Sequence, residues 1–472
     1  MSLSRSVYDR APVFLQNVMC TLAGAVRNRQ RYDRRFAERR QFFRNAGRWS
    51  IEEAETYQLS RLKELADHAY ANVPYYKQAF DDAGVRPSDI QSLSDWQRLP
   101  LLSKDDVRRA GKSLICQNEV AQKLVETHSG GSTGMPLTCY HSRDSLADVY
   151  ACFWETHRLN VEPEDRYATF QGLELIPPRQ TKGPYWRSNL AMRQRLYSIF
   201  HLSETTIRSY INDLDKFKPV YIAGYANSLY LLAKLAQEQN ITPRWSPKAV
   251  YSTSEQLFPN YRQTIAEVFN TDVWDAYSQD ETCGSITEYE CGYYHYDRAY
   301  GFMEFLELEQ TADHRLAEVV CTGFLNDSWP LFRYRPGDIV EYEPAETCPK
   351  CGRAGPIIHA IRGRTGDVLV TPSGRRFPHI SLIVKKLHGV RQVQVVQNAV
   401  DQIIIRFVAS EDFRGPEDES LMVRCFKEAI NEPIEWIPER VDEIQRTKMG
   451  KFMSIINNIN SGKGATPVEN AT

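Results

Sequence analysis

Short apolar runs alternate with amphipathic segments between residues 123 and 277, and this alternation constrains the fold more than any other feature of the chain. The runs have the length of strands, whereas apolar residues in the amphipathic segments recur at helical spacing. Such alternation is typical of a layered α/β domain, in which helices cover the faces of a sheet. The predicted strands are residues 123–127, 220–223, 249–252 and 273–277, and the predicted helices are residues 145–159, 228–239 and 259–269.

The length of 472 residues points to two or three domains rather than one core. Residues 1–365 are predicted to form a large layered α/β domain that begins with a helical, basic extension over residues 1–50. Residues 366–456 are predicted to form a small α+β domain, because a Val- and Ile-rich alternating segment at 390–408 precedes a helical pattern. The small and polar residues 457–472 are predicted to be a disordered tail.

The N-terminal extension combines an apolar stretch with a basic one. Residues 11–26 are mostly apolar, but Gln16 and Asn17 interrupt the run, which favours a docked helix over a signal peptide. Residues 27–45 contain eight arginines. They indicate a solvated helical face or, with the apolar stretch, a peripheral contact of residues 11–45 with anionic lipid. No apolar run reaches the roughly 18 residues that a membrane-spanning helix needs.

Charge and cysteine content narrow the class of protein. Lys and Arg number 58 and Asp and Glu number 60, and this balance argues against a general nucleic-acid binder. The ten cysteines are scattered along the chain. Without a secretory signal, they favour a reduced, cytoplasmic setting over a disulfide framework. The sequence carries no signal for an oligomeric state.

The segment 127–136 (THSGGSTGMP) has the composition of a phosphate-binding loop. Glycines let the backbone approach a phosphate with its N–H groups turned inward, and hydroxyl side chains add neutral donors. The segment has neither the Gly-Lys-Ser/Thr ending nor the G-x-G-x-x-G pattern of common nucleotide sites, so a surface linker is the alternative. The candidate phosphate ligands are Ser129, Gly130, Gly131, Ser132, Thr133 and Gly134.

Four metal-ligating side chains form a second candidate site. Cys348 and Cys351 are two residues apart and precede a glycine, which is the pattern of a zinc knuckle. Cys291 and His295 are the expected second pair. A set of three cysteines and one histidine would be a closed, structural zinc site. The alternatives are an unliganded turn with free thiols and a redox pair, although no thioredoxin-like context surrounds the cysteines.

Four further segments follow the candidate phosphate loop, and the five in order resemble the adenylate-forming superfamily of acyl-CoA synthetases, firefly luciferase and peptide-synthetase adenylation domains. Shorter phrases are similar to its phenylacetate-CoA ligase and CapK-like branch. The four segments are 277–281 (YSQDE), 333–338 (RYRPGD), 362–367 (RGRTGD) and 446–451 (RTKMGK). The shorter phrases are 73–76 (VPYY), 252–255 (STSE), 329–334 (WPLFRY) and 393–397 (VQVVQ).

The resemblance implies a reaction in two halves on a large α/β domain with a small mobile C-terminal domain. A carboxylate attacks the α-phosphorus of ATP, and the acyl group then passes from AMP to a nucleophile. The implied roles are phosphate binding by Ser129, Ser132, Thr133 and the glycines between and after them, adenine contact by Tyr277, ribose binding by Asp338, Mg²⁺ binding by Glu281, and stabilisation of the reacting phosphates by Arg364 and Lys451.

Two positions depart from the pattern of the superfamily. Asp280 stands where a threonine is usual, and a carboxylate there either helps to hold the metal or weakens nucleotide binding. Gly366 stands where the hinge motif usually has aspartate or lysine. Glycine frees the backbone for a swivelling domain, but it also removes a side chain that could stabilise one of the two domain poses.

The expected function is activation of a carboxylic acid followed by thioester formation with CoA, so ATP, Mg²⁺, CoA and a structural Zn²⁺ are the expected cofactors. Transfer to an amine or hydroxyl acceptor is the first alternative. A nucleotide-binding scaffold without catalysis is the second. The acid is expected along residues 221–228 and 252–277, with Tyr225 and Ser254 as candidate contacts and residues 170–178 as a further wall.

Overall fold

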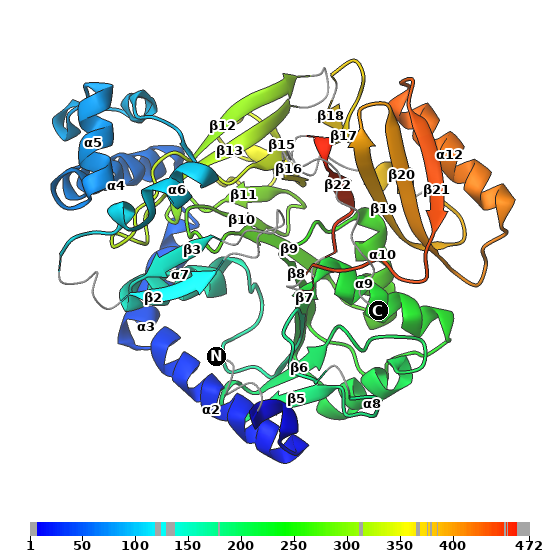
Figure 1. The fold of residues 1–472 in the computed structure, drawn as a ribbon. Helices are drawn as coiled ribbons and strands as arrows, with labels where there is room; N and C mark the ends of the chain where they lie inside the picture. Colours follow the sequence, from blue (N-terminus) through cyan, green and yellow to red (C-terminus); the bar gives the residue numbers. More distant parts are fainter. Residues whose placement is uncertain are drawn as a thin grey trace.

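The computed structural model describes residues 7–118, 124–128, 137–177, 180–310, 315–364, 369–374, 376–377, 380–384, 386–447, 450 and 452–459. Figure 1 shows a large domain built on one curved sheet and a small C-terminal domain with a sheet of its own. The loop 129–136 and Lys451 lie outside the described residues, as does the side chain of Arg364. No helix in the described part of the chain is long and apolar enough to cross a membrane.

Helices at the N-terminus cover one side of the large domain (Figure 1). The fourth helix, α4, begins at a capping box in which Ser50 and Glu53 each accept the other's backbone N–H. It ends before Pro74, which cannot continue a helix but fits the first turn of the next one. The helices are α2 (Val13–Arg31), α3 (Arg34–Ala46), α4 (Ile51–Asn72), α5 (Pro74–Ala83), η1 (Pro87–Asp89), η2 (Ser94–Arg98), α6 (Lys104–Ala110) and η3 (Gly111–Leu114).

The parallel half of the large sheet contains the strands predicted at 220–223, 249–252 and 273–277, whereas the segment predicted as a strand at 123–127 contributes β2 to a separate hairpin. Strands β6, β4, β7, β8 and β9 lie side by side in parallel. Parallel neighbours require crossover connections, and the helices between them supply these. The elements are β4 (Tyr167–Gln171), β5 (Trp186–Asn189), η5 (Leu190–Met192), β6 (Gln194–Ser198), α8 (Ile207–Phe217), β7 (Tyr221–Tyr225), α9 (Ala226–Glu238), β8 (Ala249–Thr253), α10 (Pro259–Phe269) and β9 (Val273–Ser278).

The other half of the sheet is mainly antiparallel and continues from β9 through β10, β11, β16, β15 and β13 to β14 and β1. A separate hairpin, β2–β3, flanks the candidate phosphate loop and leads into α7. The elements are β1 (Leu102–Ser103), β2 (Val125–His128), β3 (Thr138–His141), α7 (Arg143–Thr156), β10 (Ser285–Glu288), β11 (Tyr294–Tyr296), β12 (Gly301–Gln310), β13 (Arg315–Gly323), β14 (Tyr334–Arg335), β15 (Asp338–Glu343) and β16 (Ile357–Arg364).

Two apolar cores lie on opposite faces of the sheet. On one face, α8, α9 and α10 pack over Phe170 and Ile222. On the other face, Tyr221 and Ala223 belong to the core that includes residues of α4, α5 and α7. Successive side chains of a strand point to opposite faces, so β7 serves both cores. The second face also carries the cavity described below.

The small domain packs one helix on an antiparallel pair with parallel strands at its edges, in the order β21-β20-β19-β22. Asn457 lies in its last strand, and the backbone N–H of Asn458 donates to Gln397 O (2.9 Å), so ordered structure continues past the predicted start of the tail. The elements are β17 (Leu369–Val370), β18 (Arg376–Phe377), α11 (Ser381–Val384), β19 (Val390–Ala399), β20 (Gln402–Ala409), α12 (Pro416–Ile430), β21 (Glu435–Arg440) and β22 (Ile455–Asn457).

Helix α2 docks on the edge of the large sheet through the polar residues that interrupt its apolar run. Buried Gln16 accepts a hydrogen bond from buried Arg187 of β5 (Nε to Oε1, 2.5 Å). Gly24 lies so close to Asn189 that an added Cβ would be 2.1 Å from its Oδ1. A helix interior accepts glycine at a small cost when a neighbour must approach this closely. The docked helix predicted for residues 11–26 is therefore observed.

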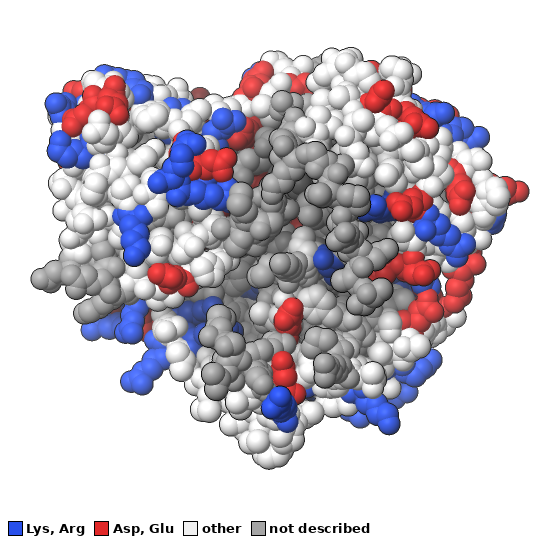
Figure 2. Space-filling view, viewed as in Figure 1, with Lys and Arg blue, Asp and Glu red and all other residues white. Residues whose placement is uncertain are grey.

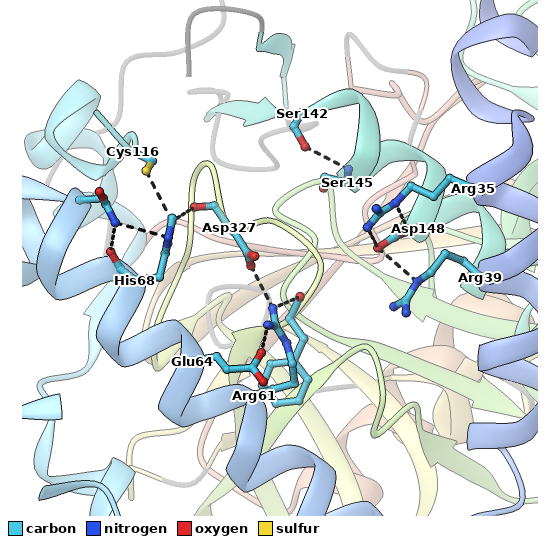
Figure 3. A network of polar contacts seen from close by, with 12 residues as sticks. Arg35, Arg39, Arg61, Glu64, His68, Cys116, Ser142, Ser145, Asp148 and Asp327 are labelled. Atoms are coloured by element: carbon cyan, nitrogen blue, oxygen red, sulfur yellow. Dashed lines mark hydrogen bonds and ion pairs between the residues drawn. The ribbon is translucent and has the colours of Figure 1, made fainter. Parts of the chain in front are cut away.

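Helix α3 is held to α7 by ion pairs (Figure 3). Arg35 and Arg39 both reach buried Asp148, at 2.7 and 3.3 Å between nitrogen and oxygen. Two turns further along, Arg44 pairs with Glu155 at 2.9 Å. These arginines of the basic segment therefore hold two helices of the protein together. The sequence had suggested instead that they lie on a solvated helical face or contact anionic lipid.

The outward face of α2 is apolar instead. Phe14, Val18, Leu22 and Val26 follow one another at intervals of four residues, and their side chains are 49–65% exposed. Residues four apart share one face of a helix, so these side chains form a continuous row, called here the α2 apolar row.

On the face of the molecule in Figure 2, positive and negative side chains are interspersed around the rim.

Candidate active site

A cavity of about 960 Å³ runs along the second face of the sheet and reaches the carboxyl ends of β4, β8 and β9. In open α/β sheets, ligands bind in the crevice outside the carboxyl ends of the strands. The hairpin β2–β3, helices α2 and α7, and residues 452–455 of the C-terminal domain complete the wall. The cavity is therefore lined by residues from three parts of the chain: the segments predicted to bind the nucleotide, the segments predicted to bind the acid, and the C-terminal domain.

Tyr277 and Asp338 meet at the rim of this cavity. The Tyr277 hydroxyl donates to Asp338 Oδ2 at 2.6 Å. Burial, together with the neighbouring Asp338 carboxylate, holds the pKa of Tyr277 well above its ordinary value. Asp338 is the first residue of β15, pairs in register with Arg364 of β16, and is largely buried. The fold thus brings together the predicted adenine contact and the predicted ribose acceptor, although they are far apart in sequence.

Glu281 is a buried carboxylate in the cavity wall. Its Oε1 accepts from the Tyr334 hydroxyl at 3.0 Å and lies 3.6 Å from Lys104 Nζ. Burial and the Glu281 carboxylate raise the pKa of Tyr334, so this hydroxyl keeps its proton and remains a donor. One oxygen is therefore oriented by the protein, which is the arrangement expected of a carboxylate that binds a hard cation.

The hairpin β2–β3 places the ends of the candidate phosphate loop at the cavity. Glu126, Thr127 and His141 line it. Thr127 Oγ1 lies 3.0 Å from His141 Nε2, and burial lowers the pKa of His141 to about 4, so the imidazole is neutral at neutral pH. The predicted ligands Ser129, Gly130, Gly131, Ser132, Thr133 and Gly134 lie outside the described residues.

The Glu255 carboxylate bridges the two domains beside the cavity, in addition to the ion pairs of Arg391 with Glu204 and Glu238. Glu255 Oε2 accepts the backbone N–H of Asn227 in the first turn of α9 (2.9 Å), and its Oε1 accepts the backbone N–H of Phe452 (2.6 Å). Arg446 adds hydrogen bonds to Asn227 Oδ1 (2.9 Å) and Ser228 Oγ (3.1 Å). Buried hydrogen bonds to charged groups are among the stronger polar contacts in proteins. We call these four hydrogen bonds the Glu255 clamp.

Gly450 completes the contact between the domains. Its φ of +75° favours glycine, and an added Cβ would stand 2.8 Å from both the Gly172 Cα and the Ile199 side chain. Gly450 and Phe452 flank residue 451, the position of the predicted catalytic lysine. The Glu255 clamp and Gly450 therefore hold the chain on both sides of that position against the large domain.

The other predicted contacts divide into two groups. Asp280 and Ser254 line the cavity, Asp280 with an exposed side chain and Ser254 at the positive φ of +66°. Leu173, from the predicted wall, also lines it. Tyr225 instead packs in the core under α9 and is not among the residues of the cavity wall. Its predicted contact with the acid has no support in the cavity lining.

Asp275 introduces a titratable group into the cavity wall. It lies on β9, is buried, and accepts from the Tyr294 hydroxyl at 3.0 Å. Burial and the nearby Glu288 carboxylate raise its pKa to about 7. This part of the wall therefore carries only part of a negative charge at neutral pH.

The four predicted metal ligands converge beside the sheet. The ligating atoms of Cys291, His295, Cys348 and Cys351 all lie within 4.8 Å of one another. His295 Nε2 is 3.6 Å from Cys291 Sγ and 3.4 Å from Cys351 Sγ. Burial and Arg353 lower the pKa of His295 to about 4, so its imidazole is neutral, as metal binding requires. The donor set and its closed shape fit a structural zinc ion.

Several side chains at the site were not assigned from the sequence. Glu255 and Arg446 lie in recognised segments, but their role depends on a contact between domains that no local pattern shows. Lys104 begins α6 and carries no motif. One sequence feature could have pointed to Glu255: it directly follows Ser254, in a segment that was expected to bind the acid.

The comparisons with known proteins agree with this architecture. Residues 369–458 match the CapK C-terminal domain family. The chain is 26% identical over 463 residues to Protein CapK of Staphylococcus aureus, covering 96% of this chain and 99% of that protein. It is 24% identical over 371 residues to a phenylacetate-coenzyme A ligase of Pseudomonas putida, covering 74% and 80% of the two chains.

The structural neighbours define the fold. A 2-hydroxyisobutyryl-CoA ligase in the postadenylation state gives a TM-score of 0.69 at 18% identity, covering 88% of this chain and 91% of that one. The same ligase in the thioesterification state gives 0.51, so the present domain arrangement is nearer to the former. The chain has the fold of the adenylate-forming superfamily. The chain is also homologous to CapK and to phenylacetate-CoA ligases, which confirms the resemblance read from the sequence.

We predict that Glu255→Gln loosens the C-terminal domain. Glutamine keeps the shape but offers one acceptor oxygen in place of two, so one of the two backbone donors loses its partner. Hydrogen bonds to charged groups contribute about 1.5–3 kcal/mol, which corresponds to a roughly 10- to 100-fold shift toward the undocked arrangement. Tryptic cleavage at residues 446–451 should accelerate accordingly.

The matched control is Glu267→Gln, which removes an exposed carboxylate on α10. It should leave the cleavage rate unchanged. Equal cleavage rates for wild type and Glu255→Gln would show that this carboxylate does not hold the domains together.

We predict that purified protein contains about one zinc ion per chain, because a closed set of three thiolates and one imidazole is a typical structural zinc site. Cys351→Ser should lower the zinc content measured by elemental analysis and reduce the melting temperature. Cys20→Ser, outside the cluster, is the control and should change neither. Wild-type protein free of zinc after purification without chelators would contradict the assignment.

Proposed function

We propose that this protein activates a carboxylic acid with ATP to form an acyl-adenylate and then transfers the acyl group to CoA. The observation that carries the proposal is the meeting of Tyr277, Asp338 and Glu281 on one cavity whose mouth is bounded by the C-terminal segment around residue 452. The homology to phenylacetate-CoA ligases supports it.

The first half-reaction needs positioning and charge stabilisation more than covalent chemistry. The carboxylate oxygen of the acid attacks the α-phosphorus, and pyrophosphate leaves. In this proposal Asp338 accepts the ribose hydroxyls, Tyr277 contacts adenine, and Ser129, Ser132 and Thr133 hold the departing phosphates. Glu281 would hold Mg²⁺, which supplies positive charge next to the phosphates.

Lys451 and Arg364 complete the proposed machinery. A cation near the α-phosphorus stabilises the negative charge that develops between carboxylate and phosphate. The clamp by Glu255 supports this role for Lys451, because the neighbouring residues on both sides contact the large domain at the cavity mouth. Release of the clamp would allow the small domain to turn for the second half-reaction.

Two other functions differ from this one in a measurable way. Transfer to an amine or hydroxyl would keep the acid-dependent release of pyrophosphate but not the dependence of the product on CoA. A non-catalytic scaffold would bind nucleotide without releasing pyrophosphate. Asp280 and Gly366, which depart from the superfamily pattern, are the only sequence features that favour the scaffold.

We predict that a library of carboxylic acids contains acids that cause pyrophosphate release from ATP, and that the final product with the best acid is a CoA thioester. Lys451→Ala should lower the rate of adenylation about 10²- to 10³-fold, as expected for loss of one group that stabilises transition-state charge. Lys427→Ala on α12 is the control. An unchanged rate in Lys451→Ala would remove that residue from the proposed mechanism.

We further propose that this protein is cytoplasmic and contacts membranes peripherally through the α2 apolar row. The row is exposed, whereas the arginines of α3 are engaged in ion pairs with α7. Phe14→Ser combined with Leu22→Ser should abolish co-sedimentation with phosphatidylglycerol vesicles, because burial of apolar area drives such binding. Leu308→Ser on β12 should not. Failure of the wild-type protein to sediment with these vesicles would refute the contact.

A further inference from the structure

The cavity extends well beyond the nucleotide end. It begins at Ser254 and Tyr277, near the carboxyl ends of β8 and β9, and reaches Tyr167 and Tyr221, the first residues of β4 and β7. The four residue steps along β7 correspond to about 13 Å of strand. We call the part around Tyr167 and Tyr221 the deep end. An acid bound with its carboxylate at the nucleotide end would point its far side there.

The two ends differ in charge. Two arginines lie beside Tyr167 at the deep end, Arg31 of α2 and Arg158 after α7, and Arg27 of α2 also lines the cavity. None of the three forms an ion pair with a carboxylate in the described part of the chain. The carboxylates of the cavity wall lie elsewhere, on the hairpin β2–β3 or toward the carboxyl ends of the strands. They are Glu126, Glu255, Asp275, Asp280, Glu281 and Asp338.

Arg158 is the most informative of these arginines because it is buried. Its Nη1 donates to the carbonyl of His157 (2.8 Å), and its guanidinium lies over the rings of Phe153 (4.3 Å) and Tyr251 (4.7 Å). Burial lowers its pKa, which means that the surroundings penalise the charged form. A buried cation normally has an anionic partner. Arg158 lines the cavity, and its polar partners are the His157 carbonyl and the Tyr221 hydroxyl, with no carboxylate among them in the described residues.

The walls around Arg158 suit a defined, partly polar ligand. The rings of Tyr167 and Tyr221 stack at 5.0 Å, and Arg31 lies over the ring of Tyr150 at 4.1 Å. Gln194 and Thr169 add uncharged polar groups. A pocket for a plain hydrocarbon or aromatic acid would need neither the arginines nor these groups.

We propose that the deep end binds a second anionic group on the acid, so that the substrate is a carboxylic acid with another carboxylate, sulfonate or phosphate at its far side. This inference rests on the proposed function for the reacting end of the acid. Arg158 is the main contact, because guanidinium groups bind oxyanions with paired hydrogen bonds. Arg31 assists from α2. The strand length above sets the separation of the two anionic groups at about 13 Å.

The test uses straight-chain dicarboxylates and the monocarboxylates of equal chain length, at roughly eight to twelve carbons to span the strand length above. With wild-type protein, kcat/KM for acid-dependent pyrophosphate release should be higher for the dicarboxylate, by roughly 10- to 100-fold as for one charge-assisted contact. Arg158→Met should remove this preference and leave the rate with the monocarboxylate close to that of wild type. Acids with a terminal sulfonate or phosphate in place of the second carboxylate identify the preferred anion.

Further variants keep the result interpretable if Arg158→Met folds poorly. Arg158→Lys retains the charge and should retain part of the preference, and Arg31→Gln should weaken it. Arg29→Gln, on the same helix but outside this cavity, is the matched control and should leave it intact. Wild-type preference for monocarboxylates, or an equal preference in wild type, Arg158→Lys and Arg31→Gln, would overturn the inference while leaving acid activation in place.

Direct binding separates this inference from the proposed function. Calorimetric titration with decanedioate and with decanoate, in the absence of ATP, should show tighter binding of decanedioate that is lost in Arg158→Met and weakened in Arg31→Gln. If no acid releases pyrophosphate but this difference persists, the proposed function fails and the anion site stands. If acids release pyrophosphate and the two ligands bind alike, the anion site fails.

Discussion

The carboxylate of Glu255 is the contact on which the arrangement of the site depends. It accepts one backbone N–H from the first turn of α9 and one from Phe452, so it joins the large domain to the end of the small one. The first turn of a helix has unpaired N–H groups and a partial positive charge, and both favour an anion. Because residues 452–455 line the cavity, this contact also helps to hold that part of the cavity wall against the large domain.

The cavity has an electrostatic gradient that follows from the topology. Parallel strands place the ends of β7, β8 and β9 at one edge, where the loops contribute carboxylates. Helix α2 reaches the opposite part only because Gln16 and Gly24 let it dock on β5, and it brings arginines with it. The cavity therefore has an acidic end and a basic end because of the docked N-terminal extension as much as because of the sheet. The four candidate zinc ligands lie between β10–β11 and the turn before β16. Strand β10 pairs with β9, which carries Tyr277.

Much of the fold could be predicted from the sequence because local patterns determine it. The helix at 259–269 has proline in its first turn and an asparagine C-cap, and its observed bounds are the predicted ones. The grouping of the four candidate metal ligands could be predicted because the chemistry of cysteine and histidine restricts their use. Tyr277 and Asp338 could be paired only through the family resemblance, since they are 61 residues apart. The Glu255 clamp and the role of Arg158 were out of reach, because each depends on the docking of distant elements.

Acid-dependent exchange of labelled pyrophosphate into ATP, without CoA, tests the central claim most directly. Exchange reports reversible formation of an acyl-adenylate and nothing later in the reaction. We predict exchange that requires both the acid and Mg²⁺ and that falls sharply in Asp338→Asn, which loses the carboxylate proposed to bind the ribose and held by Tyr277. Formation of ADP and phosphate in place of exchange, or an absence of exchange with every acid tested, would contradict it.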